Sequence, residues 1–175
     1  MTGSRRAAWL VAGAVVVILA IVAFAVWQSS DDDGADNAVS GGLVANVESA
    51  RAPFAGLTAG TITVGGKQLR VVVADAEDER VQGLRQKFDA TPYDGMFFVF
   101  PSDGLFSFTM ATVPDALEIV FYASDGRVVD RLRMEPCPDG NDNTCPAYTP
   151  KGPFRYALET GAGVVYDGSL SVPIG

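Results

Sequence analysis

The hydrophobic pattern divides the chain into an apolar N-terminal run, a polar stretch and a long region of short apolar segments. Residues 7–27 carry no charged side chain, and at the helical rise of 1.5 Å they span about 31 Å, the thickness of a bilayer's hydrocarbon core. Trp9 and Trp27 lie near the two ends of this run, where interfacial aromatic residues are common. The pattern predicts a transmembrane helix over residues 7–27.

Charges on either side of this run predict its orientation. Arg5 and Arg6 precede it and residues 31–33 are aspartates, so the positive-inside rule places residues 1–6 in the cytoplasm. The prediction is a single-pass cell-membrane protein with an extracytoplasmic C-terminal domain. A cleaved signal peptide is the alternative, because residues 23–25 form a small-x-small site. The apolar run is longer than signal peptides usually have.

The remaining residues predict a linker and one β-rich domain. Residues 28–56 are rich in Ser, Asp, Gly, Ala and Asn, which favours a flexible acidic linker. From residue 57 to 175, short β-branched and aromatic runs alternate with turn residues. Gly65-Gly66 and Asp125-Gly126 are hairpin signals, and the continuous apolar run 95–100 is typical of a strand buried on both faces. We predict a mainly β fold, a compact β-sandwich or jelly-roll-like domain with one short helix.

The predicted helix follows the first hairpin. Asp75 is placed to cap it, and residues 77–79 are acidic, which suits the positive end of the helix dipole. Val81, Leu84 and Phe88 recur at helical spacing and predict the face that packs on the sheet.

Composition excludes several function classes. The chain has 21 acidic and 13 basic residues and no histidine, for a net charge of −8. This charge argues against nucleic-acid binding, and the lack of histidine rules out histidine-dependent triads and imidazole metal ligands. We therefore predict no metal site and no cofactor. Residues 139–143 resemble the start of a calcium loop, but Thr144 and Pro150 replace the Gly and Glu that such a loop needs, so a polar turn is favoured.

Two cysteines lie in one predicted loop outside the membrane. Cys137 and Cys145 are expected to form a disulfide, because an oxidising compartment favours pairing. Free reactive thiols are the alternative, and a catalytic cysteine would lack a histidine partner.

Carboxylates are the remaining candidates for acid–base chemistry. Glu118 interrupts an apolar strand, and Glu159 ends another. If both face one cleft, they satisfy the requirement of a carboxylate-dependent hydrolase, for example one acting on glycans. The alternative is that both are ordinary ion-paired residues.

Several apolar side chains can line a cavity for a small ligand. The predicted ligand-binding residues are Met96, Met110, Glu118, Tyr148 and Arg155. Four phenylalanines are expected to line the same cavity as the methionines and Tyr148: Phe98, Phe100, Phe106 and Phe108. Ordinary core packing is the alternative for this set.

Several segments together resemble the family called domain of unknown function 192, over about Leu69 to Gly163. The matching segments are Arg80 with Gly83-Leu84-Arg85, Asp94 to Pro101, Ser107 to Met110, Leu117 to Phe121, Asp125 to Val129, Pro136-Cys137, Cys145 to Tyr148, and Arg155 to Glu159 with Gly161-Ala162-Gly163. The resemblance implies a compact, mainly β domain, often secreted or membrane-anchored, with no established activity.

This chain departs from the family at its most polar stretch. The family usually reads Phe-Trp-Met-Lys-Asn-Thr followed by Pro-Leu-Asp. Here residues 108–113 read Phe-Thr-Met-Ala-Thr-Val, and residues 116–118 read Ala-Leu-Glu. If this stretch forms the family's site, part of it is missing here, which favours a binding module over an enzyme.

Three functions remain open. The first is a membrane-anchored module that binds a small ligand or a component of the cell envelope. The second is the carboxylate-dependent hydrolase that uses Glu118 and Glu159. The third is a structural or protein-interaction module whose partner is another envelope protein.

Overall fold

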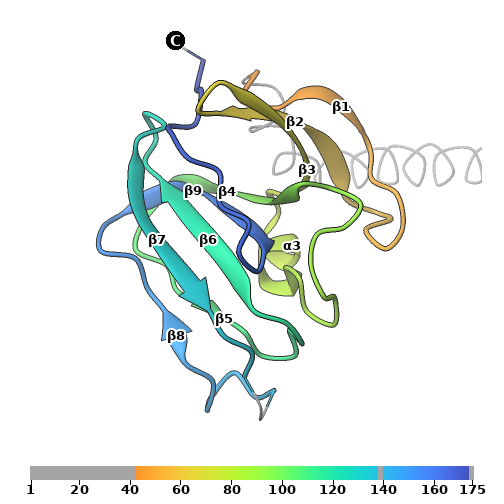
Figure 1. The fold of residues 1–175 in the computed structure, drawn as a ribbon, viewed down its shortest axis with the longest axis vertical. Coiled ribbons are helices and arrows are strands. Elements are labelled where there is room, and N and C mark those ends of the chain that lie inside the picture. The colour runs from red at the N-terminus through yellow and green to blue at the C-terminus, as the bar shows by residue number, and fades with distance from the viewer. Residues whose placement is uncertain (1–41, 138–139, 174–175) are drawn as a thin grey trace, which may run out of the picture. The chain divides into compact units, whose positions relative to one another are not determined.

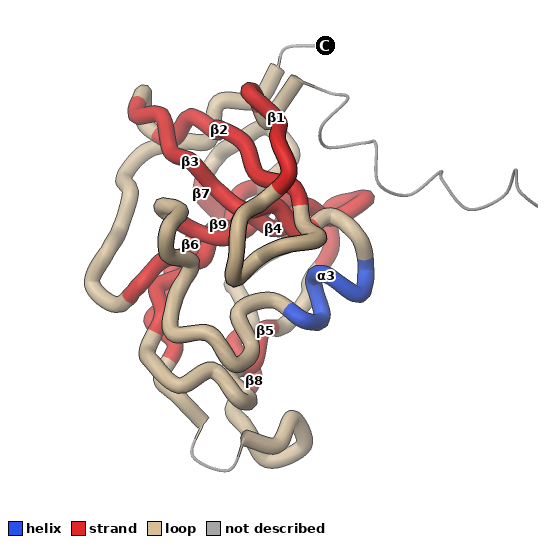
Figure 2. Tube along the Cα trace, turned by 90° about the vertical axis from the view of Figure 1, so that its right-hand side faces the viewer, coloured by secondary structure: helices blue, strands red, loops and turns tan. Residues whose placement is uncertain are grey.

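The computed structural model describes residues 42–137 and 140–173. Within them, seven strands form one sheet in the order β1-β2-β3-β4-β9-β6-β7, and two short strands, β5 and β8, form a second (Figure 1). The elements are β1 (Ala45–Ser49), β2 (Thr58–Val64), β3 (Lys67–Ala74), α3 (Glu77–Gln82), β4 (Gly95–Gly104), β5 (Phe108–Thr109), β6 (Leu117–Tyr122), β7 (Val128–Met134), β8 (Ala147–Tyr148) and β9 (Phe154–Gly161). Most of the described chain outside the strands is loop (Figure 2). The prediction of a mainly β domain with one short helix is confirmed for these residues.

Both predicted hairpins are present. Gly65 and Gly66 have φ angles of 56° and 81° and join β2 to β3, because a two-residue turn of this kind needs positive φ at both positions. Gly126, with φ 81°, lies in the turn between β6 and β7. A Cβ atom at Gly126 would overlap the backbone carbonyl of Leu170, so this turn also packs tightly against the C-terminal segment.

The topology differs from the predicted β-sandwich or jelly roll. Those folds pack two antiparallel sheets, whereas here β3 and β4 pair in parallel and belong to one large mixed sheet. A parallel pair needs a crossover, and the segment that contains α3 supplies it. Strand β9, late in the sequence, lies between β4 and β6 and pairs antiparallel with both. Local hydrophobic patterns do not encode either long-range pairing.

Helix α3 is too short to contain the whole apolar stripe that Val81, Leu84 and Phe88 predict. Glu79, not Asp75, caps its start: the Glu79 carboxylate accepts hydrogen bonds from the backbone N–H groups of Asp75 and Ala76. Val81 and Phe88 are 66% and 69% exposed, so they do not pack on the sheet. The helix ends at Gly83, whose φ of 45° breaks the helical geometry, and Leu84 alone of the stripe is buried.

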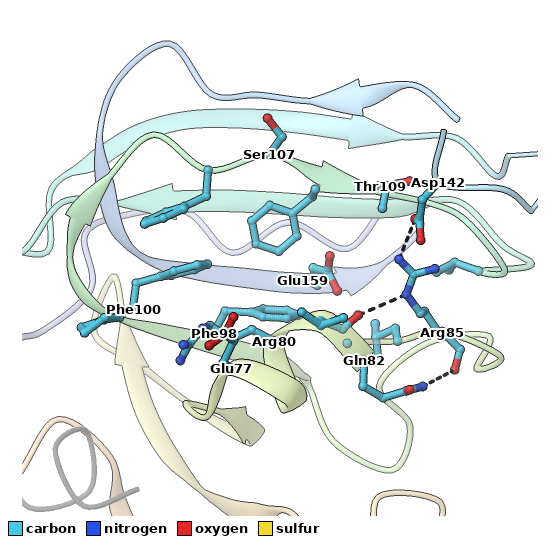
Figure 3. A pocket seen from close by; sticks show the side chains of 17 residues that line it. Glu77, Arg80, Gln82, Arg85, Phe98, Phe100, Ser107, Thr109, Asp142 and Glu159 are labelled. Carbon is cyan, nitrogen blue, oxygen red and sulfur yellow. Dashed lines mark hydrogen bonds and ion pairs between the residues drawn. The ribbon is translucent and has the colours of Figure 1, made fainter. Parts of the chain in front are cut away.

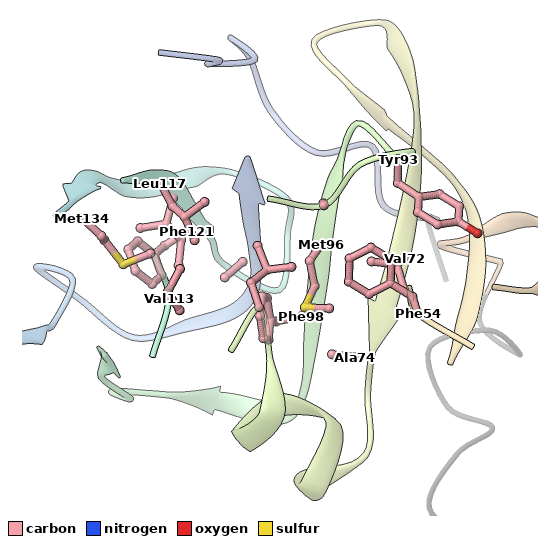
Figure 4. Close-up of a cluster of buried hydrophobic side chains, with 14 of the residues drawn as sticks. Phe54, Val72, Ala74, Tyr93, Met96, Phe98, Val113, Leu117, Phe121 and Met134 are labelled. Carbon is pink, nitrogen blue, oxygen red and sulfur yellow. The ribbon is translucent and has the colours of Figure 1, made fainter. Parts of the chain in front are cut away.

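Alternation along the strands builds one hydrophobic core on each face of the sheet. Figure 4 shows part of the first core, in which Met96 and Phe98 of β4 lie with Leu117 and Phe121 of β6. The second core holds their neighbours from the other face: Val71, Val73, Phe97, Val99, Val120, Tyr122 and Leu158, with Leu43, Val44 and Leu170. Residues 95–100 are all buried, as predicted for a strand covered on both faces.

The folded domain begins earlier than the sequence suggested. Residues 42–56, assigned to the flexible linker, contain β1 and place Leu43, Val44 and Phe54 in the cores. All five residues of β1 are exposed, and its register with β2 shifts between Ala45 and Glu48.

The predicted transmembrane helix at residues 7–27 and the rest of the linker lie outside the described residues. Among the described residues, no helix has the length and apolar character needed to cross a membrane.

The other edge of the sheet is β7, which is rich in charge. Its Arg131 bonds to Asp167, and its Arg133 bonds to Glu118 at 3.0 Å and to Glu135 at 2.6 Å. Both edges of the described sheet therefore carry exposed polar or charged side chains.

The predicted disulfide is present. Cys137 and Cys145 are bonded, with their Cα atoms 5.5 Å apart, and no free cysteine remains in the chain.

Candidate functional site

A pocket of about 540 Å³ lies between α3, β4 and the segment around β5 (Figure 3). Its lining combines a charged rim, a group of phenylalanines and a single carboxyl group from β9. The lining residues are Glu77, Arg80, Val81, Gln82, Gly83, Leu84, Arg85, Phe98, Phe100, Pro101, Phe106, Ser107, Phe108, Thr109, Val113, Asp142 and Glu159.

The carboxyl group from β9 belongs to Glu159, which the strand register places on the face of the first core. Glu159 pairs across the strands with Met96 of β4 and Ile119 of β6, and both neighbours are fully buried. Glu159 itself is only 4% exposed. No hydrogen bond or ion pair joins its carboxyl group to any residue in the described ranges.

Burial without a partner changes the acidity of Glu159. Removal from water disfavours the charged carboxylate, and it raises the pKa of Glu159 to about 8. The side chain is therefore mostly protonated at neutral pH, and it can both donate and accept a hydrogen bond in the pocket.

Phenylalanines form an apolar wall in the same pocket. The ring of Phe98 meets the ring of Phe108 edge to face, with centroids 5.1 Å apart. Phe106 stacks on Phe100 with centroids 4.5 Å apart. Gly83 lies beside this wall, since a Cβ atom at this position would be in ordinary contact with the Phe98 ring at 3.5 Å. The wall is thus fixed by ring-to-ring packing and by the end of α3.

Arg80 connects α3 to the sheet at one side of the pocket. Its Nη1 donates to the backbone carbonyl of Val99 at 2.9 Å and to that of Asp75. Its guanidinium lies over the Phe100 ring, 5.2 Å from the centroid. The side chain fixes the crossover segment against β4 and brings a positive charge to the pocket.

Arg85 connects three segments at the opposite side. Its Nε donates to the carbonyl of Val81, its Nη1 to that of Ala111 and its Nη2 to the carboxylate of Asp142, at 3.1, 3.1 and 2.7 Å. Asp142 lies in the loop closed by the disulfide. Arg85 therefore joins the end of α3, the segment after β5 and the disulfide loop around the pocket (Figure 3).

The structure does not bring the two candidate catalytic carboxylates together. Glu118 is opposite Thr160 in the pairing of β6 with β9, one position away from the pair that contains Glu159. Because successive strand residues point to opposite faces, the two glutamates lie on different faces of the sheet. Glu118 pairs with Arg133 at 3.0 Å and accepts the N–H of Gly163 at 3.2 Å. The two glutamates therefore do not face one cleft, which is the condition that the hydrolase hypothesis sets.

The five predicted ligand-binding residues lie outside the pocket lining. Met96 and Met110 are fully buried in the first core, so the packing alternative holds for them. The Tyr148 hydroxyl exchanges hydrogen bonds with the backbone of Glu135. Arg155 lies on β9, and its buried Nε has no hydrogen-bond partner among the described residues. Glu118 has the ion pair with Arg133.

Other residues of the sequence analysis do line the pocket. All four phenylalanines of the predicted cavity do so, and Glu159 is the one candidate carboxylate that does. Sequence reasoning missed Arg80 and Arg85 as site residues. A signal was present, because both belong to the segment around Gly83-Leu84 that resembles the family, but the side-chain reach that brings them to the pocket is a tertiary property.

Within residues 42–137 and 140–173, no cluster of three or more Cys, Asp or Glu side chains is placed to hold a metal ion. The pocket has an apolar wall, one nearly buried carboxyl group and a charged rim, in which Arg85 is fully engaged in hydrogen bonds.

Comparison with known proteins places the chain in a family and a fold. The family model for domain of unknown function 192 (DUF192), described as an uncharacterized ACR, matches residues 60–172. No curated protein matches the chain.

Two solved structures have a similar fold. A protein of unknown function from Novosphingobium aromaticivorans DSM 12444 is 20% identical with a TM-score of 0.58, over 79% of this chain and 99% of that one. A protein from Sinorhizobium meliloti 1021, whose description proposes a transcription regulator, is 23% identical with a TM-score of 0.51, over 64% of this chain and 90% of that one. At these identities the likeness shows the fold alone.

Proposed function

The chain belongs to the DUF192 family, and we propose that this member is a binding module that takes a small ligand into the pocket between α3, β4 and the β5 segment. The observation that carries the proposal is Glu159, which is only 4% exposed, lines the pocket and has no hydrogen-bond partner in the described residues.

Such a carboxyl group is costly to maintain. A carboxyl group that is nearly buried and has no protein partner loses most of its hydration without compensation, and this loss calls for an explanation. A buried carboxyl group in an apolar cluster reduces stability compared with an apolar residue of similar size. A ligand that supplies the missing partner explains its presence.

The dimensions and chemistry of the pocket agree with this role. Small-molecule pockets usually measure about 300–1,000 Å³ and combine apolar walls with a few polar groups, and the volume here is about 540 Å³. Phe108 and Thr109, which begin the stretch that departs from the family's polar signature, line the pocket. The departures from that signature therefore bear on ligand choice.

Thermal unfolding of the full chain in detergent, with the disulfide intact, tests this proposal against a panel of sugars, nucleotides, amino acids, fatty acids, aromatic amines and divalent metals. A ligand at one hundred times its dissociation constant adds about 2.7 kcal/mol to the free energy of unfolding. We expect at least one stabilising compound whose effect is lost in Glu159→Gln. The matched control is Glu118→Gln, which removes a carboxylate from the neighbouring strand on the other face of the sheet.

Each outcome of the panel is informative. A stabilising compound that acts equally on wild type and Glu159→Gln binds elsewhere and contradicts the role of the pocket. A panel without any stabilising compound contradicts the proposal and favours a protein-interaction module whose partner is another envelope protein.

For the location of this binding, we propose the extracytoplasmic face of the cell membrane, with residues 7–27 as the anchor. The sequence of that run and the disulfide between Cys137 and Cys145 support this location, since disulfides persist in oxidising compartments. In fractionated cells the chain should stay in the membrane pellet after an alkaline wash, and deletion of residues 1–27 should release it. Recovery of the full chain in the soluble fraction would contradict the anchor.

A further inference from the structure

We infer that the ligand of this pocket is an amphipathic amine, a molecule with an apolar or aromatic body and a protonated amino group that pairs with Glu159. This inference rests on the proposed function and specifies the class of ligand.

The position of Glu159 is the first argument. Its cross-strand neighbours, Met96 and Ile119, are apolar and offer no donor, and the carboxyl group lies in the pocket lining with Phe98 and Phe100 (Figure 3). An ammonium group supplies both hydrogen-bond donors and the opposite charge, so it satisfies a buried carboxylate better than a neutral donor does. A ligand carbonyl would satisfy only the O–H of the protonated acid.

The charge balance of the lining is the second argument. The titratable groups around the pocket are Glu77 and Arg80 of α3, Arg85 after it, Asp142 of the disulfide loop and Glu159 of β9. The lining residues of β4 and β5 carry no charge. With Glu159 ionised, three carboxylates face two guanidiniums, which leaves a net charge of −1. One ammonium group makes the lining neutral.

The engagement of the two arginines is the third argument. Arg85 uses Nε, Nη1 and Nη2 for Val81, Ala111 and Asp142, and Arg80 uses Nη1 for two backbone carbonyls. All three guanidinium nitrogens of Arg85 are engaged in bonds that hold segments of the fold together, so Arg85 is poorly placed to bind an anionic ligand. Arg80 shares its Nη1 between two carbonyls, and its guanidinium lies over the Phe100 ring. The apolar body of the amine would lie along Phe98 and Phe108, whose rings also attract a nearby cation.

The proton balance of binding follows from the acidity of Glu159. Burial raises the pKa of Glu159 to about 8, so the free protein holds a proton there at neutral pH. When an ammonium group binds, the Glu159 O–H bond breaks, the proton leaves to the buffer, and the ammonium keeps all of its own protons. Binding therefore tightens as the pH rises toward 8.

Three probes that share a phenylalkyl body and differ in the end group test the inference: 4-phenylbutylamine, 4-phenylbutyramide and 4-phenylbutyrate. Each is titrated calorimetrically into the full chain in detergent, at several values of pH and in two buffers of different ionisation enthalpy. The amine should bind most tightly, and its dissociation constant should fall about tenfold between pH 6 and pH 7 and level off above about pH 8. At pH 7.5 the two buffers should report release of about 0.8 proton per amine bound.

Variants separate the role of Glu159 from general binding. Glu159→Gln should weaken the amine at least tenfold and abolish both the pH dependence and the proton release. Glu118→Gln should leave the affinity for the amine, its pH dependence and the proton release unchanged. The comparison of the three probes on the wild-type chain needs no variant, so the test holds even if Glu159→Gln folds poorly.

The possible results separate this inference from the proposed function. If the amide or the carboxylate binds as tightly as the amine and this binding is lost in Glu159→Gln, the amine class is wrong and the pocket remains a binding site. If none of the three probes binds, the amine class is also wrong, and the broader thermal panel then decides the proposed function on its own.

Discussion

Glu159 should make the stability of this domain fall as the pH rises. Its pKa is about 8 in the folded chain and about 4.5, the ordinary value for glutamate, in the unfolded chain. Between these two values the folded state holds more protons than the unfolded state, so the free energy of unfolding decreases with increasing pH. The contribution of Glu159 is thus least unfavourable below pH 4.5 and reaches its full cost above pH 8.

The size of this effect follows from the two pKa values. Each difference of one in pKa corresponds to 1.36 kcal/mol, so relative to low pH Glu159 lowers the free energy of unfolding by about 3 kcal/mol at pH 7 and by about 5 kcal/mol well above pH 8. These are large fractions of the stability of a typical domain. They are upper values, because water entering the pocket would solvate the carboxylate.

Urea unfolding of wild type and Glu159→Gln, followed by circular dichroism from pH 5 to pH 9 at fixed ionic strength, measures this effect. We expect the variant to gain stability relative to wild type with rising pH, by about 4 kcal/mol over this range. The contributions of the other titratable groups to the pH dependence cancel, because these groups are present in both proteins. Asp75 is one of these, since burial raises its pKa to about 6 with a smaller contribution from Glu79, and it is present in both proteins.

The control is Glu118→Gln, measured over the same range. It removes a carboxylate from the adjoining strand, where Arg133 already provides an ion pair. A difference between wild type and Glu159→Gln that stays constant from pH 5 to pH 9 would refute the reasoning, because it would mean that Glu159 is solvated or paired.

Three further predictions concern the fold and are measured by urea unfolding. Phe154→Ala should cost about 3–5 kcal/mol, since this fully buried ring contacts four other aromatic rings. Gly66→Ala should lower the free energy of unfolding by about 1 kcal/mol, because the residue has a positive φ and open space around it. Gly65→Ala should lower it clearly more, because its Cβ would overlap the loop after β9. Equal losses for the two variants would contradict this packing. The double change Cys137→Ser and Cys145→Ser should cost about 2.6 kcal/mol in the loop-entropy model, and an unchanged midpoint would contradict it.

Features encoded over a few residues were predictable from the sequence. The turns at Gly65-Gly66 and Asp125-Gly126 are set by residues that favour positive φ. Burial of β4 on both faces follows from its unbroken apolar run. Cys137 and Cys145 had no other cysteine with which to pair.

Features that depend on long-range pairing were not predictable in this way. The parallel pair of β3 and β4 and the insertion of β9 between β4 and β6 join strands far apart in the chain. β1 lies in a stretch whose composition, rich in Ser, Asp, Gly, Ala and Asn, predicts a linker, and all five of its residues are exposed. Its place in the sheet comes from backbone pairing with β2, which leaves little trace in residue type.

The candidate site was predictable only in part. Glu159 could be singled out as a carboxylate at the end of an apolar strand, but its face depends on the register with β6, which places Thr160 rather than Glu159 opposite Glu118. Arg80 and Arg85 were visible as family-like residues. Their position at the pocket depends on how α3 and the following loop lie against the sheet.

The two edges of the large sheet have a consequence for how copies of this domain behave at high concentration. An open sheet presents unpaired backbone groups at its outer strands, and these can template fibre growth or edge-to-edge aggregation. Here one outer strand, β1, has a shifted register and carries Glu48, which pairs with Arg70. The other outer strand, β7, carries Arg131 and Arg133. An irregular edge and a charged edge both oppose strand addition, so copies of this domain should resist edge-to-edge association even when they are concentrated.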